Sequence, residues 1–234
     1  MNTKIIRAFT VSYSLDLIEN VIPELSKRYE VVLLTSPGPE LDDVERRCGV
    51  RGIRVPMERR ISLKHDFISL LNLIKTFRKE KPRMVHSMTP KAGLLCMMGA
   101  WIARVPVRVH TFTGLVFPTA TGSKRRILMF TDWLTCACAT HVIPEGKGVM
   151  ADLRNNGITK KPMKVLGDGS VKGIDLKRFH GRRNADRNEK FTFLFVGRIV
   201  RDKGINELVE AFVKLNQKYV ECRLVLVGPF EDDL

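Results

Sequence analysis

A short segment in the last fifth of the chain places two cations in a glycine turn. An apolar run at residues 191–196 is followed by Gly197, Arg198, Lys203 and Gly204, and an amphipathic stretch comes next. A strand that feeds a helix through glycines aims backbone N–H groups and the positive helix end at a phosphate. We therefore expect Arg198 and Lys203 to hold a phosphate-bearing ligand, although cations on an exposed turn are also common.

Polar residues also follow two apolar runs in the first half of the chain, at residues 83–86 and 107–111. Ligands of open parallel sheets bind beyond the carboxyl ends of the strands. We therefore expect one crevice here, with Lys91 at a helix N-terminus as a phosphate seat. The residues expected around it are His86, Thr89, Lys91, Gly93, His110, Thr111, Thr113 and Gly114. A histidine at a strand end can equally be a satisfied structural residue, and this alternative stays open.

Two further segments complete the candidate site. Ser14 follows the first apolar run, in a junction that lacks the GxGxxG fingerprint of dinucleotide-binding domains. Gly169, Ser170, Gly173 and Asp175 form a glycine-dense loop that we interpret as an interdomain hinge. No GxxxxGK[ST], GxSxG or HExxH motif is present, which argues against P-loop, α/β-hydrolase and zincin chemistry.

Strand-like and helix-like segments alternate along most of the chain. Apolar runs predict strands at residues 4–11, 31–35, 51–55, 83–86, 107–111, 141–143, 164–166, 191–196 and 223–227. Amphipathic stretches predict helices at 15–26, 41–48, 66–79, 124–139 and 145–155, and helices that begin at Pro90 and Ile205. In the helix at Pro90 we expect the hydroxyl of Thr89 to act as the N-cap.

This order predicts an α/β fold with a Rossmann-like, doubly wound parallel sheet covered by helices on both faces. We place the first domain at residues 1–180, a polar linker at 181–190 and an incomplete second Rossmann-like domain at 191–234. Two strands and one helix cannot bury an α/β core by themselves. Either further parts of the second domain are missing, or another surface covers it.

The composition constrains partners and location. The chain has 234 residues, 44% of them hydrophobic, and a formal net charge of +15, which calls for an anionic partner. No nucleic-acid-binding motif is visible, so phosphorylated substrates or an anionic membrane surface remain. There is no signal peptide, and the longest apolar run, residues 92–103, is too short to span a bilayer. We expect a cytoplasmic protein, with peripheral attachment to the inner face of the membrane left open.

Four segments together resemble the family-4 retaining glycosyltransferases of the GT-B fold, and in particular bacterial enzymes that build surface polysaccharides and lipid-linked oligosaccharides. They are VHSMTPKAGLL at 85–95, RVHTFTGLVF at 108–117, GSVKGIDLKRF at 169–179 and FVGRIVRDKGINELVEAF at 195–212. The order and spacing of the set carry the resemblance, which covers nearly the whole chain.

The resemblance implies a nucleotide diphosphate sugar, expected to be UDP-linked, as donor and a glycan or polyprenyl-diphosphate-linked acceptor. Arg198 and Lys203 would stabilise the departing diphosphate as catalytic cations, and Gly197, Gly204 and Glu231 would line the donor site. The residues of the expected crevice would shape the acceptor side. Retention by front-face attack would need no protein nucleophile, no cofactor and no metal.

The sequence departs from the family pattern at two places. Many relatives carry a histidine that contacts the donor sugar where this chain has Thr113. The family's EX7E glutamate pair should lie beyond Leu234, so we expect little transfer from these 234 residues alone. Two alternatives stay open: a GT-B nucleotide-sugar epimerase, and a non-catalytic module that binds anionic lipid or a lipid-linked sugar.

Overall fold

The computed structural model describes residues 3–58, 62–177, 179, 191–218 and 222–230. The chain divides into two compact units, residues 1–174 and 175–234. The predicted linker at 181–190 lies outside the described residues, so the expected domain boundaries stay a prediction.

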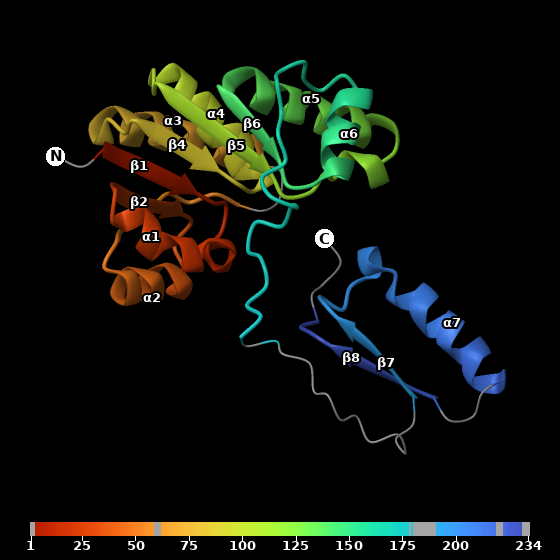
Figure 1. The fold of residues 1–234 in the computed structure, drawn as a ribbon. Helices are drawn as coiled ribbons and strands as arrows, with labels where there is room; N and C mark the ends of the chain where they lie inside the picture. The colour runs from red at the N-terminus through yellow and green to blue at the C-terminus, as the bar shows by residue number, and fades with distance from the viewer. Residues whose placement is uncertain (1–2, 59–61, 178, 180–190, 219–221, 231–234) are drawn as a thin grey trace. The chain divides into compact units, whose positions relative to one another are not determined.

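The first unit is built on one parallel sheet of six strands, shown from red to green in Figure 1. The strands are β1 (Thr3–Ala8), β2 (Tyr29–Thr35), β3 (Arg51–Arg54), β4 (Met84–Ser87), β5 (Val107–Phe112) and β6 (His141–Pro144). Their order is β3-β2-β1-β4-β5-β6, so the direction of winding reverses between β1 and β4. This confirms the predicted doubly wound sheet. In such sheets ligands bind at the carboxyl ends of the strands beside the reversal, which here are β1 and β4.

Helices cover both faces of this sheet. They are α1 (Ile22–Ser26), α2 (Pro39–Cys48), α3 (Leu63–Glu80), α4 (Pro90–Ile102), α5 (Gly122–Cys138) and α6 (Lys147–Asn155). Leu73 of α3, Leu95 of α4 and Cys136 of α5 belong to one buried cluster. Ile22 of α1 and Leu41 of α2 belong to a second cluster. Successive apolar side chains of a strand point to opposite faces of the sheet, so they contribute to two separate cores.

Two predicted elements of the first unit are wrong. Residues 15–26 do not form one helix: they include the end of the 3₁₀ helix η1 (Ser12–Leu17), the 3₁₀ helix η2 (Glu19–Val21) and the short α1. Pro23 has no N–H to donate into a continuous helix, so the α-helix starts next to it instead. The predicted strand at 164–166 is absent, and only Met163 forms a bridge with Val142.

The second unit contains fewer elements. Strand β7 (Phe191–Val196) pairs in parallel with β8 (Cys222–Val227), and the short 3₁₀ helix η4 (Arg201–Lys203) leads into α7 (Ile205–Lys218). None of the described residues of α7 is buried, and Leu194 and Val196 of β7 are largely exposed. As expected, these elements leave much apolar surface uncovered.

In the first unit a further 3₁₀ helix, η3 (Phe117–Thr119), precedes α5. No helix within the described ranges is long and apolar enough to cross a membrane.

An ion cluster fastens the amino-terminal edge of the sheet. The carboxylate of Glu80, at the end of α3, accepts hydrogen bonds from Lys4 of β1 and Arg51 of β3, each at 3.0 Å. These hydrogen bonds, with Arg51 contributing most, lower the pKa of Glu80 from 4.5 to about 2. Glu80 therefore holds one helix and two strands through its ionised form.

We expect Glu80→Gln to lower the free energy of unfolding at pH 7 by about 1–2 kcal/mol, because two charge-assisted hydrogen bonds are lost. Since the folded pKa lies below the unfolded one, the contribution of Glu80 is complete above pH 4.5 and disappears as the pH falls towards 2. Urea unfolding followed by circular dichroism between pH 3 and pH 7 measures both effects.

The control is Glu24→Gln, which removes an exposed carboxylate paired with Lys27. Exposed pairs contribute about 0–1 kcal/mol. Equal losses of stability in both variants would contradict a special role for Glu80.

Candidate functional site

The carboxyl ends of β1 and β4 are joined by a pair of threonines. The backbone N–H of Thr10 donates to the hydroxyl of Thr89 at 2.8 Å, and the two hydroxyls lie 2.7 Å apart. The Thr10 hydroxyl also accepts the backbone N–H of Ala92 at 3.1 Å. The reversal point of the sheet is therefore closed by hydrogen bonds between residues almost 80 positions apart.

This pairing changes the expected N-terminus of α4. The structure shows Thr89 at the N-cap position, but its hydroxyl caps no N–H of the helix. The hydroxyl instead accepts the N–H of Thr10, and Thr10 caps Ala92 in its place. The prediction that Thr89 caps its own helix is thus wrong, because a residue from the neighbouring strand does so.

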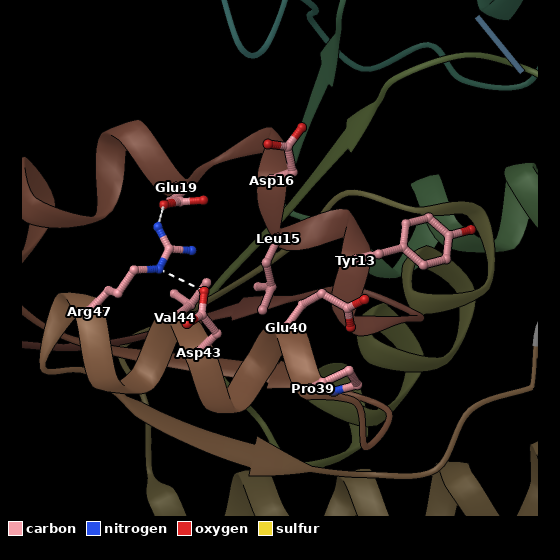
Figure 2. A pocket seen from close by; sticks show the side chains of 9 residues that line it. All are labelled: Tyr13, Leu15, Asp16, Glu19, Pro39, Glu40, Asp43, Val44 and Arg47. Atoms are coloured by element: carbon pink, nitrogen blue, oxygen red, sulfur yellow. Dashed lines mark hydrogen bonds and ion pairs between the residues drawn. The ribbon is translucent and has the colours of Figure 1, made fainter. Parts of the chain in front are cut away.

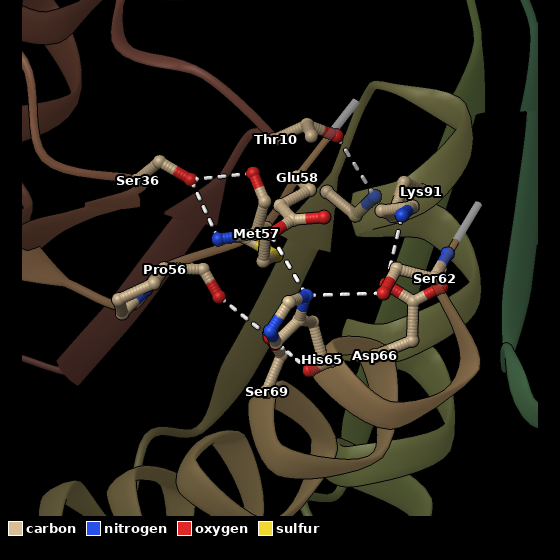
Figure 3. A network of polar contacts seen from close by, with 11 residues as sticks. Thr10, Ser36, Pro56, Met57, Glu58, Ser62, His65, Asp66, Ser69 and Lys91 are labelled. Atoms are coloured by element: carbon tan, nitrogen blue, oxygen red, sulfur yellow. Dashed lines mark hydrogen bonds and ion pairs between the residues drawn. The ribbon is translucent and has the colours of Figure 1, made fainter. Parts of the chain in front are cut away.

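A polar network extends from this point to the start of α3 (Figure 3). The ammonium of Lys91 forms an ion pair of 2.7 Å with Asp66, and both side chains are mostly buried. The Asp66 carboxylate also accepts the backbone N–H of Ser62 at 3.2 Å. Lys91 thus connects the first turns of α3 and α4, and its role as a phosphate seat stays a prediction.

His86 and Thr111 lie beside each other on neighbouring strands. His86 Nε2 lies 2.8 Å from the Thr111 hydroxyl. Burial, reinforced by the charge of Arg7 and by His110, holds the pKa of His86 well below its usual value of 6.5. Its imidazole is therefore neutral at pH 7.

Arg7 is the directly opposed neighbour of His86 on β1. Its Nη2 lies 3.1 Å from the sulfur of Met88, and its Nε makes no hydrogen bond with any residue that the structure describes. Burial lowers the pKa of the guanidinium to about 10, which leaves Arg7 charged at pH 7. A buried cation thus lies beside His86, and no pattern in the sequence indicates it.

The side chain of His110 is buried in the first unit. It is 1% exposed, its Nδ1 lies 2.8 Å from the Ser87 hydroxyl, and its ring meets Phe112 edge-on. Burial lowers the pKa of His110 to about 3. Gly93 lies directly against this ring, since a Cβ on Gly93 would approach it within 2.5 Å. These contacts fit the interpretation of His110 as a buried structural residue better than the interpretation of it as an acceptor-binding residue.

The other expected crevice residues lie nearer the surface. The hydroxyl of Thr113 donates to the carbonyl of Met88 at 3.3 Å, which connects the ends of β4 and β5. Gly114 follows in an open loop, where an added Cβ would meet no described atom within 4 Å. Ser14 is half-buried in η1, and its N–H donates to Val11 at 3.2 Å. Their contacts with an acceptor stay predictions.

A hollow of about 380 Å³ lies between η1 and α2 (Figure 2). It is lined by Tyr13, Leu15, Asp16, Glu19, Pro39, Glu40, Asp43, Val44 and Arg47. Arg47 is paired with Glu19 and Asp43. The excess of carboxylates repels an anionic ligand, so this hollow does not suit a nucleoside diphosphate.

The first part of the expected hinge is held against the first unit. Gly169 has a φ of 95°, and a Cβ there would lie 2.7 Å from the carbonyl oxygen of Glu145, so glycine is required. The carboxylate of Glu145 accepts the N–H of Val171 at 3.0 Å. Lys172 forms an ion pair of 2.6 Å with Asp16. The loop therefore has fixed contacts beyond the carboxyl end of β6.

The remaining hinge residues make local turns. Ser170 has a φ of 66° and its hydroxyl accepts the N–H of Gly173, whose φ is 69°. Asp175 begins the second unit, and its carboxylate accepts the N–H of Lys177 at 2.9 Å. These left-handed positions suit a change of chain direction, and a hinge motion stays a prediction.

In the second unit, the ends of β7 and β8 come into close backbone contact. The N–H of Gly197 donates to the carbonyl of Val227 at 2.9 Å. A Cβ on Gly228 would lie 1.8 Å from the carbonyl oxygen of Gly197. Gly228 is therefore needed for this approach, a role that no pattern in the sequence indicates.

The two expected cations lie on the turn that follows. Gly204 adopts the left-handed conformation at φ 71°, and its carbonyl accepts the N–H of Leu208 to open α7. Lys203, immediately before it, is exposed, and Arg198 is half-buried. The strand–turn–helix arrangement predicted for phosphate binding is therefore present. Glu231, the remaining expected donor residue, lies outside the described residues.

Two family models match the chain. One, described as a glycosyl transferase 4-like domain, matches residues 17–169, and one described as glycosyl transferases group 1 matches residues 177–234. The first match covers more than half of the chain, so the protein belongs to this glycosyltransferase family.

Curated relatives agree with this assignment. The chain is 34% identical to the capsular polysaccharide biosynthesis glycosyltransferase CapM of Staphylococcus aureus, over 99% of this chain and 63% of the relative. It is 31% identical to an Escherichia coli UDP-Gal:alpha-D-GlcNAc-diphosphoundecaprenol alpha-1,3-galactosyltransferase, over 78% of this chain and 50% of the relative. The chain thus spans half to two thirds of the length of these relatives.

Solved structures with the same fold include proteins in complex with UDP or with a UDP-sugar. Anabaena Alr3699/HepE in complex with UDP and glucose matches with a TM-score of 0.72 and 15% identity, over 99% of this chain and 62% of the other. The UDP-GlcNAc 2-epimerase of Neisseria meningitidis bound to UDP-GlcNAc matches with a TM-score of 0.58 and 17% identity, over 99% and 67%. At such identities the likeness shows the fold alone.

We expect Gly93→Ala to destabilise the first unit by about 1–3 kcal/mol, because the added methyl group overlaps a buried ring that Ser87 holds in place. Gly148→Ala in α6 is the matched control, since nothing lies within 4 Å of its Cβ position. That change should be neutral or raise stability by up to about 1 kcal/mol. Thermal and urea unfolding of the two variants measure the difference, and a stable Gly93→Ala variant would contradict the packing described.

Proposed function

We propose that the whole protein is a retaining glycosyltransferase that moves a hexose from a UDP-linked sugar to a lipid-linked glycan acceptor during synthesis of a capsule-like polysaccharide. Membership of the glycosyltransferase family carries this proposal. The strand–turn–helix position of Arg198 and Lys203 supports it, because that position suits a diphosphate.

In the proposed reaction, Arg198 and Lys203 stabilise the leaving group. The bond between the anomeric carbon and the diphosphate oxygen breaks, and its electron pair stays on the diphosphate. The two cations and the N-terminus of α7 offset this charge. The acceptor hydroxyl attacks from the same face, and its proton passes to the departing phosphate oxygen. This proposal, which follows the family resemblance, uses no protein nucleophile, no cofactor and no metal.

We propose that the acceptor binds at the carboxyl edge of the sheet in the first unit. There, Thr10, Thr89 and Lys91 fix the loops around the point where the winding reverses, and Arg7 places a positive charge beneath it. A cation suits a diphosphate-bearing acceptor. The name of the E. coli relative includes a diphosphoundecaprenol acceptor, which supports a lipid-linked substrate here. We therefore also propose a cytoplasmic protein that works at the inner face of the membrane.

The epimerase alternative rests on fold likeness alone. UDP-GlcNAc 2-epimerases share the fold at 17% identity, whereas the curated relatives at 34% and 31% identity are transferases. Epimerisation or hydrolysis of a UDP-sugar without acceptor would favour that alternative. Binding to anionic lipid without affinity for any nucleotide sugar would favour the non-catalytic module.

We expect Arg198→Ala and Lys203→Ala to lower the rate of sugar transfer by about 100-fold or more, because each removes a charge that acts on the leaving diphosphate. The measurement is transfer of radiolabelled sugar from UDP-sugars to a bacterial lipid extract. UDP affinity, measured by calorimetry, should fall by about tenfold. Lys214→Ala is the control, since this exposed lysine lies further along α7.

Transfer that is unaffected by both substitutions would contradict the assignment of these cations. A whole protein that converts UDP-sugars without any acceptor would contradict the transferase itself. The low activity expected of these 234 residues alone stays a prediction, so UDP binding is the readout for this chain.

A further inference from the structure

The amino-terminal edge of the sheet in the first unit carries a hollow of about 660 Å³. It lies where α3 and α4 end and where β1, β4 and β5 begin, at the edge opposite the carboxyl ends of these parallel strands (Figure 1). Its lining includes five basic residues and no carboxylate, the basic residues being Lys4, Arg78, Lys81, Arg83 and Arg104. A hollow lined by charges of one sign attracts ions of the other sign.

Most of this positive charge is not neutralised by the described chain. Lys4 is paired with Glu80 at 3.0 Å and with Glu30 at 3.4 Å. The side chains of the other four cations form no ion pair or hydrogen bond with any residue in the described ranges. By contrast, Arg47 and Arg54 of the same unit each pair with two carboxylates. The hollow therefore gathers cations whose partner is not part of the described structure.

Two of these four cations occupy backbone positions that usually hold glycine. Lys81 ends α3 with a φ of 47°, and Arg104 follows α4 with a φ of 60°. The N–H of Val105 donates to the carbonyl of Ala100 at 2.8 Å, so Arg104 is the left-handed residue of a Schellman turn. Among the described non-glycine residues, only Ser170 also has a positive φ. This conformation costs free energy for a residue with a Cβ, and glycine would avoid that cost.

The partial negative charge at a helix C-terminus explains these cations only in part. It favours basic residues in the last turn, where α3 already has Arg78 and Lys79. It does not require a cation at the left-handed position itself, and it does not account for Arg83, which lies just before β4. An anionic ligand in the hollow accounts for all four cations.

The backbone around the hollow is rigid. Pro82 lies in the turn from α3 to β4 and Pro106 in the turn from α4 to β5, and each proline fixes its own φ. The buried side chains of Phe77 and Val105 line the hollow from the interior of the unit. The backbone that carries the cations is therefore fixed before a ligand binds, which lowers the entropic cost of binding.

We propose that this hollow is a separate anion site, which binds a small soluble ligand with several phosphate groups. Small-ligand sites have volumes of about 300–1,000 Å³, so this hollow suits a molecule of nucleotide size. Arginine and lysine bind phosphate through charge-assisted hydrogen bonds. A concave site also suits a compact ligand better than it suits a flat lipid surface.

This inference goes beyond the proposed transferase. The hollow and the proposed acceptor crevice lie at opposite edges of the sheet, so the ligand does not compete with the acceptor. A ligand bound in the hollow contacts the ends of both α3 and α4, and it therefore stabilises the first unit against unfolding.

The probe is inorganic tripolyphosphate, added to the 234-residue chain in buffer without divalent metal. We expect binding in calorimetry, a higher melting temperature, and slower amide hydrogen exchange at residues 78–83 and 103–107. Raising the salt concentration should weaken the binding. A variant with Arg198→Ala and Lys203→Ala lacks the other expected phosphate site and should keep this binding, so the result does not depend on the proposed function.

The decisive variant combines Lys81→Gly with Arg104→Gly. Glycine suits both left-handed positions, so without ligand this variant should melt at the temperature of the parent chain or above it. Its affinity for tripolyphosphate should fall by about tenfold or more, because two charges are lost. A purely structural role of the two cations predicts the reverse, namely a lower melting temperature and an unchanged affinity.

A second variant and a matched control complete the test. Arg78→Gln with Arg83→Gln removes the other two cations at positions with ordinary backbone conformation, and should also weaken binding by about tenfold. Lys147→Gln with Arg154→Gln removes two exposed charges from α6, which does not line the hollow. This control should weaken binding by about twofold at most.

Equal loss of affinity in the control would overturn the site, because net charge alone would then explain the binding. Unchanged affinity in both hollow variants would overturn it as well. Binding to vesicles that contain phosphatidylglycerol, or to heparin, without affinity for tripolyphosphate would overturn the small-ligand proposal and assign the hollow to a lipid surface or to an acidic polymer.

Discussion

The first unit depends on the close approach of α4 to the sheet at the point where the strand order reverses. Gly93 allows the helix backbone to lie against the His110 ring, and the hydroxyls of Thr10 and Thr89 fasten the two strand ends beneath it. The buried ring has its polar atom satisfied by Ser87, so the approach leaves no unpaired group at His110 Nδ1. Lys91 in the first turn of α4, and the loop at Thr113 that bonds to Met88, lie next to this contact.

Much of this architecture could be predicted from the sequence, because parallel strands and amphipathic helices leave strong periodic signals. The predicted limits of strand β7 and the predicted first residue of α7, Ile205, match the observed ones. The single helix predicted at 15–26 is absent although its apolar pattern is regular, because Pro23 cannot donate a backbone hydrogen bond within a continuous helix. The prediction of a strand at 164–166 is wrong because a short apolar run does not indicate whether a neighbouring strand is available to pair with it.

The contacts that define the site were harder to predict, since they join residues far apart in sequence. Nothing near Lys91 in the sequence points to Asp66, and nothing near Thr89 points to Thr10. The two histidines look alike in the sequence, as residues at strand ends, yet their neighbours differ. His110 is enclosed by Ser87, Phe112 and Gly93, whereas His86 lies beside Thr111 and opposite a buried arginine. A sequence pattern indicates which face of the sheet a side chain points to. It does not indicate which residues from other segments cover that side chain.

The pairing of β1 with β4 also constrains the order in which the chain can fold. Strand β1 can pair with β2 as soon as residue 35 has left the ribosome, but its other edge stays open until β4 is made, about 80 residues after it. Closing so long a loop is entropically costly, and long-range parallel pairing is slow. During synthesis, β1 therefore presents an unpaired edge for several seconds, at typical rates of about 5–20 residues per second. Nascent chains of this protein would be most in need of chaperones in that interval.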